Sequence, residues 1–193
     1  MRDRTGDELD RDLDSVLIGG REPFTPVISD YDPAWPARFA ELEVRIRSTL
    51  GDAALAIEHI GSTSVPQLAA KPIVDVLVVV ADVEDESSYV RALEGAGLVL
   101  RVREARHRMF RTPERDVHVH VYPAGDQAIR DYLDLRDWLR VDESDRALYA
   151  GVKRDLAQRR WTDMNHYADA KTDVIRQVLG RAREWRTHAD RLP

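Results

Sequence analysis

One segment constrains the fold more than any other part of the chain: residues 73–80, with the sequence IVDVLVVV. Its β-branched residues favour a strand, and apolar side chains occupy both alternating sets of positions. A strand that is apolar on both faces belongs in the interior of a sheet rather than at an exposed edge. We therefore predict that residues 72–81 form a central strand.

An aspartate interrupts this apolar strand. By alternation, Asp75 shares a face with Ile73, Leu77 and Val79. An ionised carboxylate in such surroundings must be hydrogen-bonded, paired with a cation, bound to a metal ion or placed at the open end of the sheet. The residues leave two interpretations open: an ion pair with an arginine, or a metal ligand beside a phosphate-binding loop.

A glycine-serine turn precedes the aspartate strand. The short apolar strand predicted over residues 55–60 leads directly into Gly61, Ser62 and Thr63. Glycine at such a turn lets backbone N–H groups converge on an anion, and the two hydroxyls add further donors. Most turns of this composition bind no ligand, so the turn alone is weak evidence. The strand with Asp75 that follows it strengthens the hypothesis of a phosphate-binding loop.

The remaining pattern predicts one α+β domain. A helix is expected with Asp32 as its N-cap and Pro33 at its first position, and it should end at Gly51. The last third of the chain is predicted to be entirely helical. The other expected elements are a helix over residues 85–95 and strands over residues 98–103, 107–112 and 116–122.

The expected architecture is a mixed β-sheet flanked by helices, with an all-helical C-terminal layer. Residues 1–22 are predicted to be a flexible lead-in with at most one loose helical turn. We predict a single domain over residues 23–185 and a tail over residues 186–193.

Composition narrows the functional classes. The 193 residues include 29 Lys and Arg against 35 Asp and Glu, a formal net charge of −6, which argues against a protein that grips nucleic acid by bulk charge. The lack of cysteine excludes disulfides, thiolate metal sites and a cysteine nucleophile. No apolar run is long enough for a bilayer, and the N-terminal residues lack a signal-peptide core. We expect a cytoplasmic protein with no membrane partner.

Two histidines alternate with valines along the strand predicted at residues 116–122. His118 and His120 share one face, roughly 7 Å apart at Cα, while the valines face the core. The pair could bind one metal ion with Asp75 or His59 as a third ligand, contact phosphate as cations, or shuttle a proton. It could also form a polar sheet face beneath the helical layer. No function is assigned to the other histidines, His107, His166 and His188.

Lysine is rare among the basic residues of this chain, and the three lysines are Lys71, Lys153 and Lys171. Lys71 lies between the glycine-serine turn and the aspartate strand. Lys153 and Lys171 each follow a tyrosine by four residues, beside the apolar stripes of their helices, and Arg136 is placed similarly. These positions favour charged groups that point into a groove between the sheet and the helical layer. The alternative is snorkelling, with the charged ends in water.

Taken together, these features resemble the GrpB family, small proteins of the nucleotidyltransferase superfamily of DNA polymerase beta. The resemblance covers about residues 24–180, and its specificity lies in the order of the matching stretches. These are Tyr31-Asp32-Pro33-Ala34-Trp35, His59-Ile60-Gly61-Ser62-Thr63, Lys71-Pro72-Ile73-Val74-Asp75, His118-Val119-His120-Val121, Leu135-Arg136-Asp137-Trp138-Leu139-Arg140, Lys153, and Tyr167 with Lys171.

The resemblance implies a glycine-serine loop that holds a nucleoside triphosphate, and paired carboxylates that, with a third acid, hold two divalent ions such as Mg²⁺. This sequence departs from that pattern. Leu77 occupies the position of the second carboxylate, and His118 and His120 stand on the strand expected to supply the third acid. A two-metal carboxylate site therefore cannot be assembled from these positions.

Two functional hypotheses follow. In the first, the protein is a nucleotidyltransferase-like enzyme that acts on a nucleotide or another phosphate-bearing small molecule. Its catalytic residues would be Asp75 and His120, and Asp75, His118 and His120 would bind Mg²⁺ or another divalent metal. The phosphate- and substrate-binding residues are expected to be His59, Gly61, Ser62, Thr63, Lys71, Arg136, Lys153, Tyr167 and Lys171.

In the second hypothesis, the protein is a non-catalytic accessory or sensor module that binds the same ligand and has lost the metal-binding acids. GrpB domains also resemble segments attached to dephospho-CoA kinases, so a partner enzyme is a candidate partner, as is a second copy of the chain. Leu77 favours this hypothesis, whereas the density of predicted polar groups favours the enzyme. A third class, RNA-binding proteins, is disfavoured by the net charge.

Overall fold

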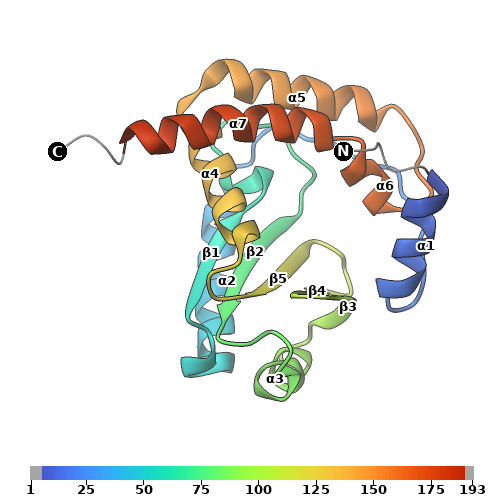
Figure 1. The fold of residues 1–193 in the computed structure, drawn as a ribbon, viewed down its shortest axis with the longest axis vertical. Coiled ribbons are helices and arrows are strands. Elements are labelled where there is room, and N and C mark those ends of the chain that lie inside the picture. Colours follow the sequence, from blue (N-terminus) through green and yellow to red (C-terminus); the bar gives the residue numbers. More distant parts are fainter. Residues whose placement is uncertain (1–5, 190–193) are drawn as a thin grey trace.

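The computed structural model describes residues 6–189, and within them a mixed five-stranded sheet with the order β1-β2-β5-β4-β3 forms the centre of the fold (Figure 1). The strands are β1 (Ala56–Ile60), β2 (Val74–Val80), β3 (Val99–Glu104), β4 (His107–Arg111) and β5 (Val117–Pro123). β2 pairs antiparallel with β1 and parallel with β5, whereas β3, β4 and β5 pair antiparallel.

The prediction of an interior strand at residues 72–81 is confirmed. β2 lies between β1 and β5, and Val74, Val76, Val78 and Val80 are buried in the main core. That core lies on one face of the sheet, beneath α2 (Trp35–Leu50) and α3 (Val90–Gly95). The opposite face of β2 packs Leu77 and Val79 against α4 (Gln127–Val141).

The C-terminal helical layer is also confirmed. After α4, the chain forms α5 (Glu143–Ala157), α6 (Met164–Asp169) and α7 (Thr172–Ala189), and α5 and α7 run across one end of the sheet (Figure 1). A second apolar cluster joins α4, α5 and α7 to the segment after β1 through Val65 and Leu68. This packing places the helical layer directly over the glycine-serine turn.

Two predicted helices differ from the structure at their ends. α2 begins at Trp35, two residues after the predicted first position, and the carboxylate of Asp32 accepts a hydrogen bond from the Ala34 N–H at 2.8 Å. The helix predicted over residues 85–95 divides into a short 3₁₀ turn (Glu86–Ser88) and α3. Side chains of Ser87 and Ser88 bond to Asp85, and such local bonds compete with a continuous helix.

The N-terminal segment is more ordered in structure than one loose helical turn. Residues Gly6–Val16 form the helix α1, whose Leu9 and Leu13 pack with Leu17 against Val102 of β3. The leucines recur at four-residue spacing, a stripe hidden among charged residues in the sequence. Residues 1–5 of the predicted lead-in and residues 190–193 of the predicted tail lie outside the described residues. The first residues of the predicted tail belong to α7, which continues to Ala189.

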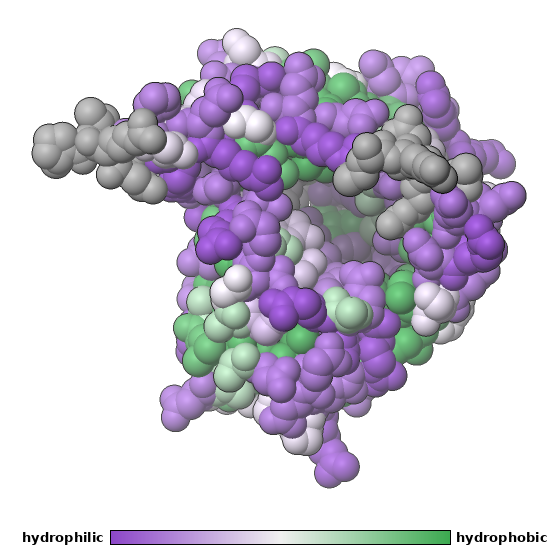
Figure 2. Space-filling model, in the orientation of Figure 1, coloured by the Kyte–Doolittle hydropathy of each residue, from purple (hydrophilic) through white to green (hydrophobic). Residues whose placement is uncertain are grey.

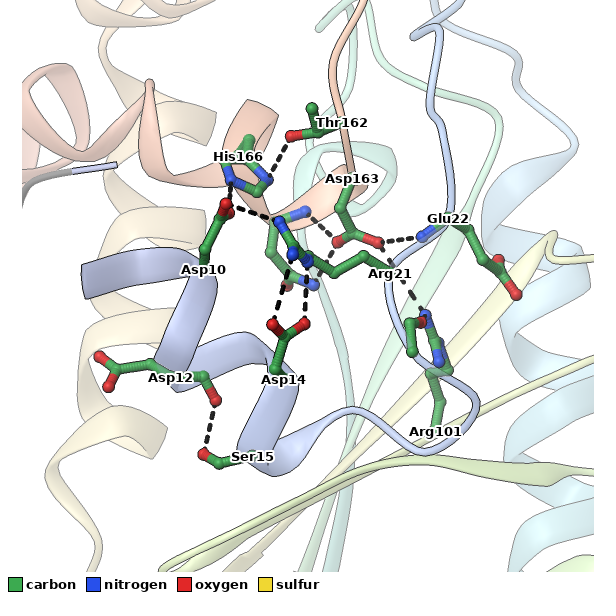
Figure 3. Close-up of polar contacts among 12 residues, drawn as sticks. Asp10, Asp12, Asp14, Ser15, Arg21, Glu22, Arg101, Thr162, Asp163 and His166 are labelled. Atoms are coloured by element: carbon green, nitrogen blue, oxygen red, sulfur yellow. Dashed lines mark hydrogen bonds and ion pairs between the residues drawn. The ribbon is translucent and has the colours of Figure 1, made fainter. Parts of the chain in front are cut away.

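Polar contacts tie this N-terminal segment to α6 (Figure 3). His166 on α6 contacts the carboxylate of Asp10 at 2.7 Å, and Arg21 forms ion pairs with Asp10 and Asp14. Asp163 accepts a hydrogen bond from the Glu22 N–H at 2.9 Å and caps α6 through the Asn165 N–H. None of the helices in the described part of the chain is long and apolar enough to cross a membrane.

Candidate functional site

A cavity of about 480 Å³ lies between the sheet and the C-terminal helical layer. Figure 2 shows this hollow, with hydrophobic residues in its depth. The cavity face of β2 and β5, the glycine-serine turn and the helices α4 to α7 all contribute to its wall. Most of the expected site residues meet here, from segments far apart in the sequence.

The turn and the strand aspartate touch. Gly61 has φ +68°, and a Cβ built on it would lie 2.9 Å from both Cβ and Cγ of Asp75. Only glycine allows both the backbone conformation and the close approach. The predicted meeting of a glycine-serine turn with Asp75 at one end of the sheet is therefore present in the structure.

Asp75, His118 and His120 form a cluster on the cavity face. Parallel pairing sets Asp75 opposite His118, and Asp75 Oδ1 lies 3.4 Å from His118 Nδ1 and 3.7 Å from His120 Nε2. Burial opposes ionisation of Asp75, but the neighbouring histidines outweigh it and hold the pKa of that carboxyl well below its usual range. Burial in turn lowers the pKa of His118. Histidines, not an arginine, are thus the recorded ion-pair partners of Asp75 among the described residues.

The donor set of this cluster decides which metal it fits. The three candidate ligand atoms lie within 4.8 Å of one another, and they comprise one carboxylate oxygen and two imidazole nitrogens. Such a set suits a single transition-metal or zinc ion with open coordination positions. Mg²⁺ prefers oxygen ligands, and Leu77, at the position of the second carboxylate, is fully buried in apolar contacts. The residues do not fit a two-magnesium centre.

All three lysines of the chain line the cavity. Lys71 Nζ and Lys171 Nζ lie over the ring of Tyr167, at 5.0 and 4.7 Å from its centroid. Lys153 Nζ lies 3.0 Å from Ser62 Oγ and donates to the carbonyl of Ala69. The snorkelling alternative is excluded for these side chains, since their charged ends point inward rather than into bulk water.

Burial dominates the electrostatics of the three lysines. Burial lowers the pKa of Lys71 and of Lys171 to about 8, and mutual repulsion adds to the effect at Lys71. Burial and neighbouring cations lower the pKa of Lys153 to about 6. No ion pair with a carboxylate is recorded for these three amines within residues 6–189, so an anion in the cavity would be attracted to all of them.

Two expected binding residues lie behind the turn instead of in the cavity. His59 stacks on Phe39 of α2, with ring centroids 4.7 Å apart, and its Nε2 lies 3.0 Å from Thr63 Oγ1. Thr63 Oγ1 donates to the Ile73 carbonyl, so it accepts from His59. Because Ile60 faces the cavity side, strand alternation turns His59 to the other face. These residues support the turn, and His59 is not the third ligand of the cluster.

Arg136 and Tyr167 also differ from simple phosphate ligands. Arg136 lines the cavity, but its guanidinium pairs with Glu58 and Asp137 and donates to the His59 carbonyl. Tyr167 is fully buried; its ring supports two lysines, and its hydroxyl has no recorded hydrogen-bond partner. Its ring therefore lies beneath two of the amines that line the cavity.

Sequence reasoning missed other residues of the site. Tyr149 lies in the cavity wall and its hydroxyl interacts with Ser62, while its ring is 4.6 Å from Lys153 Nζ. The four-residue spacing of Tyr149 and Lys153 was the available signal. Tyr132 on α4 contacts His120, with ring centroids 5.8 Å apart. The signal for Tyr132 was its place in the apolar stripe of that helix, which packs against the sheet.

Comparison with known proteins decides the family. The model of the family described as GrpB protein matches residues 25–181. The chain belongs to the GrpB family. A UPF0157 protein of Streptomyces coelicolor is 54% identical over 166 residues, which cover 86% of this chain and 89% of that protein. The crystal structure of conserved protein GrpB from Enterococcus faecalis has a TM-score of 0.71 at 31% identity and covers 82% of this chain and 99% of that one.

More distant comparisons show the type of fold and a similarity to part of a longer protein. A Cid1 poly(U) polymerase structure matches with a TM-score of 0.50 at 15% identity, covering 68% of this chain and 43% of that one, so this GrpB protein has a nucleotidyltransferase-like fold. A dephospho-CoA kinase of Mycolicibacterium paratuberculosis is 28% identical over 183 residues, which cover 80% of this chain and 45% of that protein. This chain therefore spans about half the length of that relative.

Proposed function

We propose that this GrpB protein binds a nucleotide or another phosphate-bearing small molecule in the cavity and transfers a nucleotidyl or phosphoryl group. One observation carries the proposal: the only three lysines of the chain converge on the wall formed by the glycine-serine turn and Asp75. Burying three amines without a recorded ion-pair partner among the described residues costs stability, and an anion bound in the cavity would offset that cost.

The wall divides into a part that suits phosphates and a part that suits an apolar body. Backbone N–H groups at Gly61 and Ser62, together with Lys71, Lys153 and Lys171, would hold the phosphates. Away from them the wall is largely apolar, and its members include Val65, Tyr132, Leu135, Leu139 and Ile175. A base or another flat, weakly polar group would fit against these side chains.

Asp75, His118 and His120 would hold one divalent ion at the reacting end of the ligand. A transition-metal or zinc ion there would act as a Lewis acid and neutralise charge on the transferred group. His120 could alternatively accept the proton of an attacking hydroxyl through the same nitrogen, Nε2, but not while that nitrogen binds metal. The short distances to Asp75 and His118 favour the ligand role.

A second candidate function is a binding module that assists an enzyme. Leu77 in place of a second carboxylate favours it, as does the similarity to part of a dephospho-CoA kinase. In this case the cavity would sense a phosphate compound, and a partner enzyme or a second copy of the chain would respond to it.

Calorimetric titration with ATP, UTP and dephospho-CoA, each with and without Mn²⁺ or Zn²⁺, tests both functions. The variants are Asp75→Ala and Lys171→Met, with Arg176→Met as the control, because Arg176 is a half-exposed cation five residues away that pairs with Asp173. We expect Lys171→Met, but not Arg176→Met, to weaken binding at least tenfold.

The outcomes separate the candidates. Metal-dependent binding that is lost in Asp75→Ala, with release of pyrophosphate or transfer to an acceptor hydroxyl, supports the enzyme. Tight binding that neither metal nor Asp75→Ala changes supports the accessory module. If none of the three phosphate compounds binds the wild-type protein, the proposed function is wrong.

A further inference from the structure

A chain of three side chains leads from the protein surface to the Asp75–His118–His120 cluster. Glu104 and His107 flank the two-residue turn between β3 and β4 and are paired across the hairpin. His107 Nδ1 lies 2.7 Å from Glu104 Oε1, and His107 Nε2 lies 3.1 Å from His120 Nδ1. His120 Nε2 then faces Asp75.

The rings are arranged for a hydrogen bond in their own plane. The planes of His107 and His120 differ by 8°, with nitrogens 3.1 Å apart and centroids 5.3 Å apart, so the rings lie edge to edge. Tyr122 lies flat on His107, at 4.5 Å between centroids and 12° between planes. His107 is thus held between its neighbours in one orientation.

Hydrogen-bond donors and acceptors along this chain can be assigned in order. An ionised Glu104 only accepts, so His107 Nδ1 carries a proton and donates to it. With that proton on Nδ1, the Nε2 of neutral His107 has a lone pair and accepts the hydrogen bond at 3.1 Å. The partner nitrogen, His120 Nδ1, must then be the donor, and in neutral His120 the lone pair is left on Nε2.

The far end of the chain agrees with this assignment. His120 Nε2 is 3.7 Å from Asp75 Oδ1, longer than a hydrogen bond. The structure thus gives an ion-pair distance but no hydrogen bond from His120 Nε2 to Asp75. With its proton on Nδ1, neutral His120 would turn the lone pair of Nε2 toward Asp75, an arrangement that a cation placed between the two atoms would stabilise.

We infer that Glu104 and His107 are positioning residues that fix the tautomer of His120, so that an unprotonated Nε2 is presented to the cavity beside Asp75. The inference rests on the proposed function only in naming a metal ion as the recipient of that lone pair. Outer partners of this kind orient a metal-binding histidine and raise its basicity. Neither Glu104 nor His107 was singled out by the sequence.

The tautomer can be measured without metal. Ring ¹⁵N chemical shifts of the metal-free wild-type protein, recorded at about pH 8 so that ordinary imidazoles are neutral, should assign the His120 proton to Nδ1. Isolated neutral histidine favours the other tautomer, so this result would show the effect of His107. A proton on His120 Nε2 in the wild-type protein would overturn the inference, and no variant needs to fold for this test.

Binding of Co²⁺ alone, followed by its visible absorption, gives a second readout. His107→Phe keeps a ring against Tyr122 but removes the acceptor, and it should weaken Co²⁺ binding about 10- to 100-fold. The matched control is His166→Phe, which removes a histidine–aspartate pair away from the cluster. Unchanged affinity in His107→Phe would overturn the inference.

Failure of the proposed metal site gives a different result. In that case the wild-type protein would not bind Co²⁺, or the Asp75→Ala variant would bind it with the same affinity as the wild type. The ¹⁵N measurement would still decide whether Glu104 and His107 fix the tautomer. The two conclusions therefore stand or fall on separate observations.

Discussion

The contact between Gly61 and Asp75 makes the substitution Gly61→Ala the most direct test of the site. Two effects of a methyl group can be worked out from the structure. The backbone of Gly61, at φ +68° and ψ −175°, is essentially restricted to glycine, and another residue there costs about 1–3 kcal/mol. The new Cβ would also lie 2.9 Å from Asp75 Cβ and Cγ, and overpacking of this kind costs about 1–3 kcal/mol.

Gly125→Ala is the matched control because it carries only the first of these effects. Gly125 has φ +79°, and nothing lies within 4 Å of a Cβ built on it. We expect Gly125→Ala to lower the free energy of unfolding by about 1–2 kcal/mol and Gly61→Ala by about 2–6 kcal/mol. Urea denaturation of both variants and the wild-type protein measures the difference.

The second readout is ligand binding. Asp75 must move to accommodate the methyl group, so Gly61→Ala should also lose Asp75-dependent binding of metal and of phosphate compounds, whereas Gly125→Ala should keep both. Equal stability losses in the two variants, or unchanged binding in Gly61→Ala, would show that the turn and the aspartate are not in contact.

Three further predictions concern the lysines and the N-terminal segment. Lys171→Met should raise the free energy of unfolding at pH 7 by about 1–2 kcal/mol, because it removes a buried, charged amine for which no hydrogen bond is recorded within the described part of the chain, yet weaken phosphate binding; equal or lower stability in thermal and urea denaturation would contradict this. Phosphate binding should weaken as pH rises above about 8, because the free protein releases protons from Lys71 and Lys171 there while the bound anion favours their charged forms; calorimetry from pH 6 to 10 tests this, and a flat profile counts against it. Asp163→Ala should lower the free energy of unfolding by about 1–3 kcal/mol, because it leaves the Glu22 and Asn165 N–H groups without their acceptor, and protease cleavage between α1 and β1 should become faster.

The same pKa shifts fix how stability itself depends on pH. In the folded protein the pKa of Lys71 and of Lys171 is lower than the ordinary value of 10.5, so the unfolded chain binds more protons between about pH 8 and 10.5. The contribution of these lysines to stability is therefore unfavourable at neutral pH and is relieved as pH rises through that window.

Much of the fold was predictable from local pattern. The valine-rich run of β2 indicates an interior strand whatever surrounds it, and the apolar stripes of α4, α5 and α7 indicate a helical layer. The scarcity of lysine pointed to residues that the cavity does bring together. These signals survive because each depends on a few neighbouring residues rather than on the tertiary structure.

Other features depend on tertiary structure. The sequence alone does not reveal which face of β1 turns to the cavity, so His59 and Thr63 were predicted in the binding site rather than behind it. The leucine stripe of α1 is diluted by acidic and basic residues, and its partner Val102 lies on a distant strand. The contact of His107 with His120 depends on the pairing of β4 with β5, which no single motif encodes.

The concentration of lysine inside the cavity has a practical consequence. Acylating reagents modify primary amines but not the guanidinium group of arginine. The side-chain amines that they can modify in this chain are therefore those of the three lysines in the cavity wall. Beyond the α-amino group, the extent of labelling is thus a direct report on whether the cavity is filled. A mass-spectrometric screen of metabolite pools that seeks protection of Lys71 and Lys171 could identify the natural ligand without any assay of turnover.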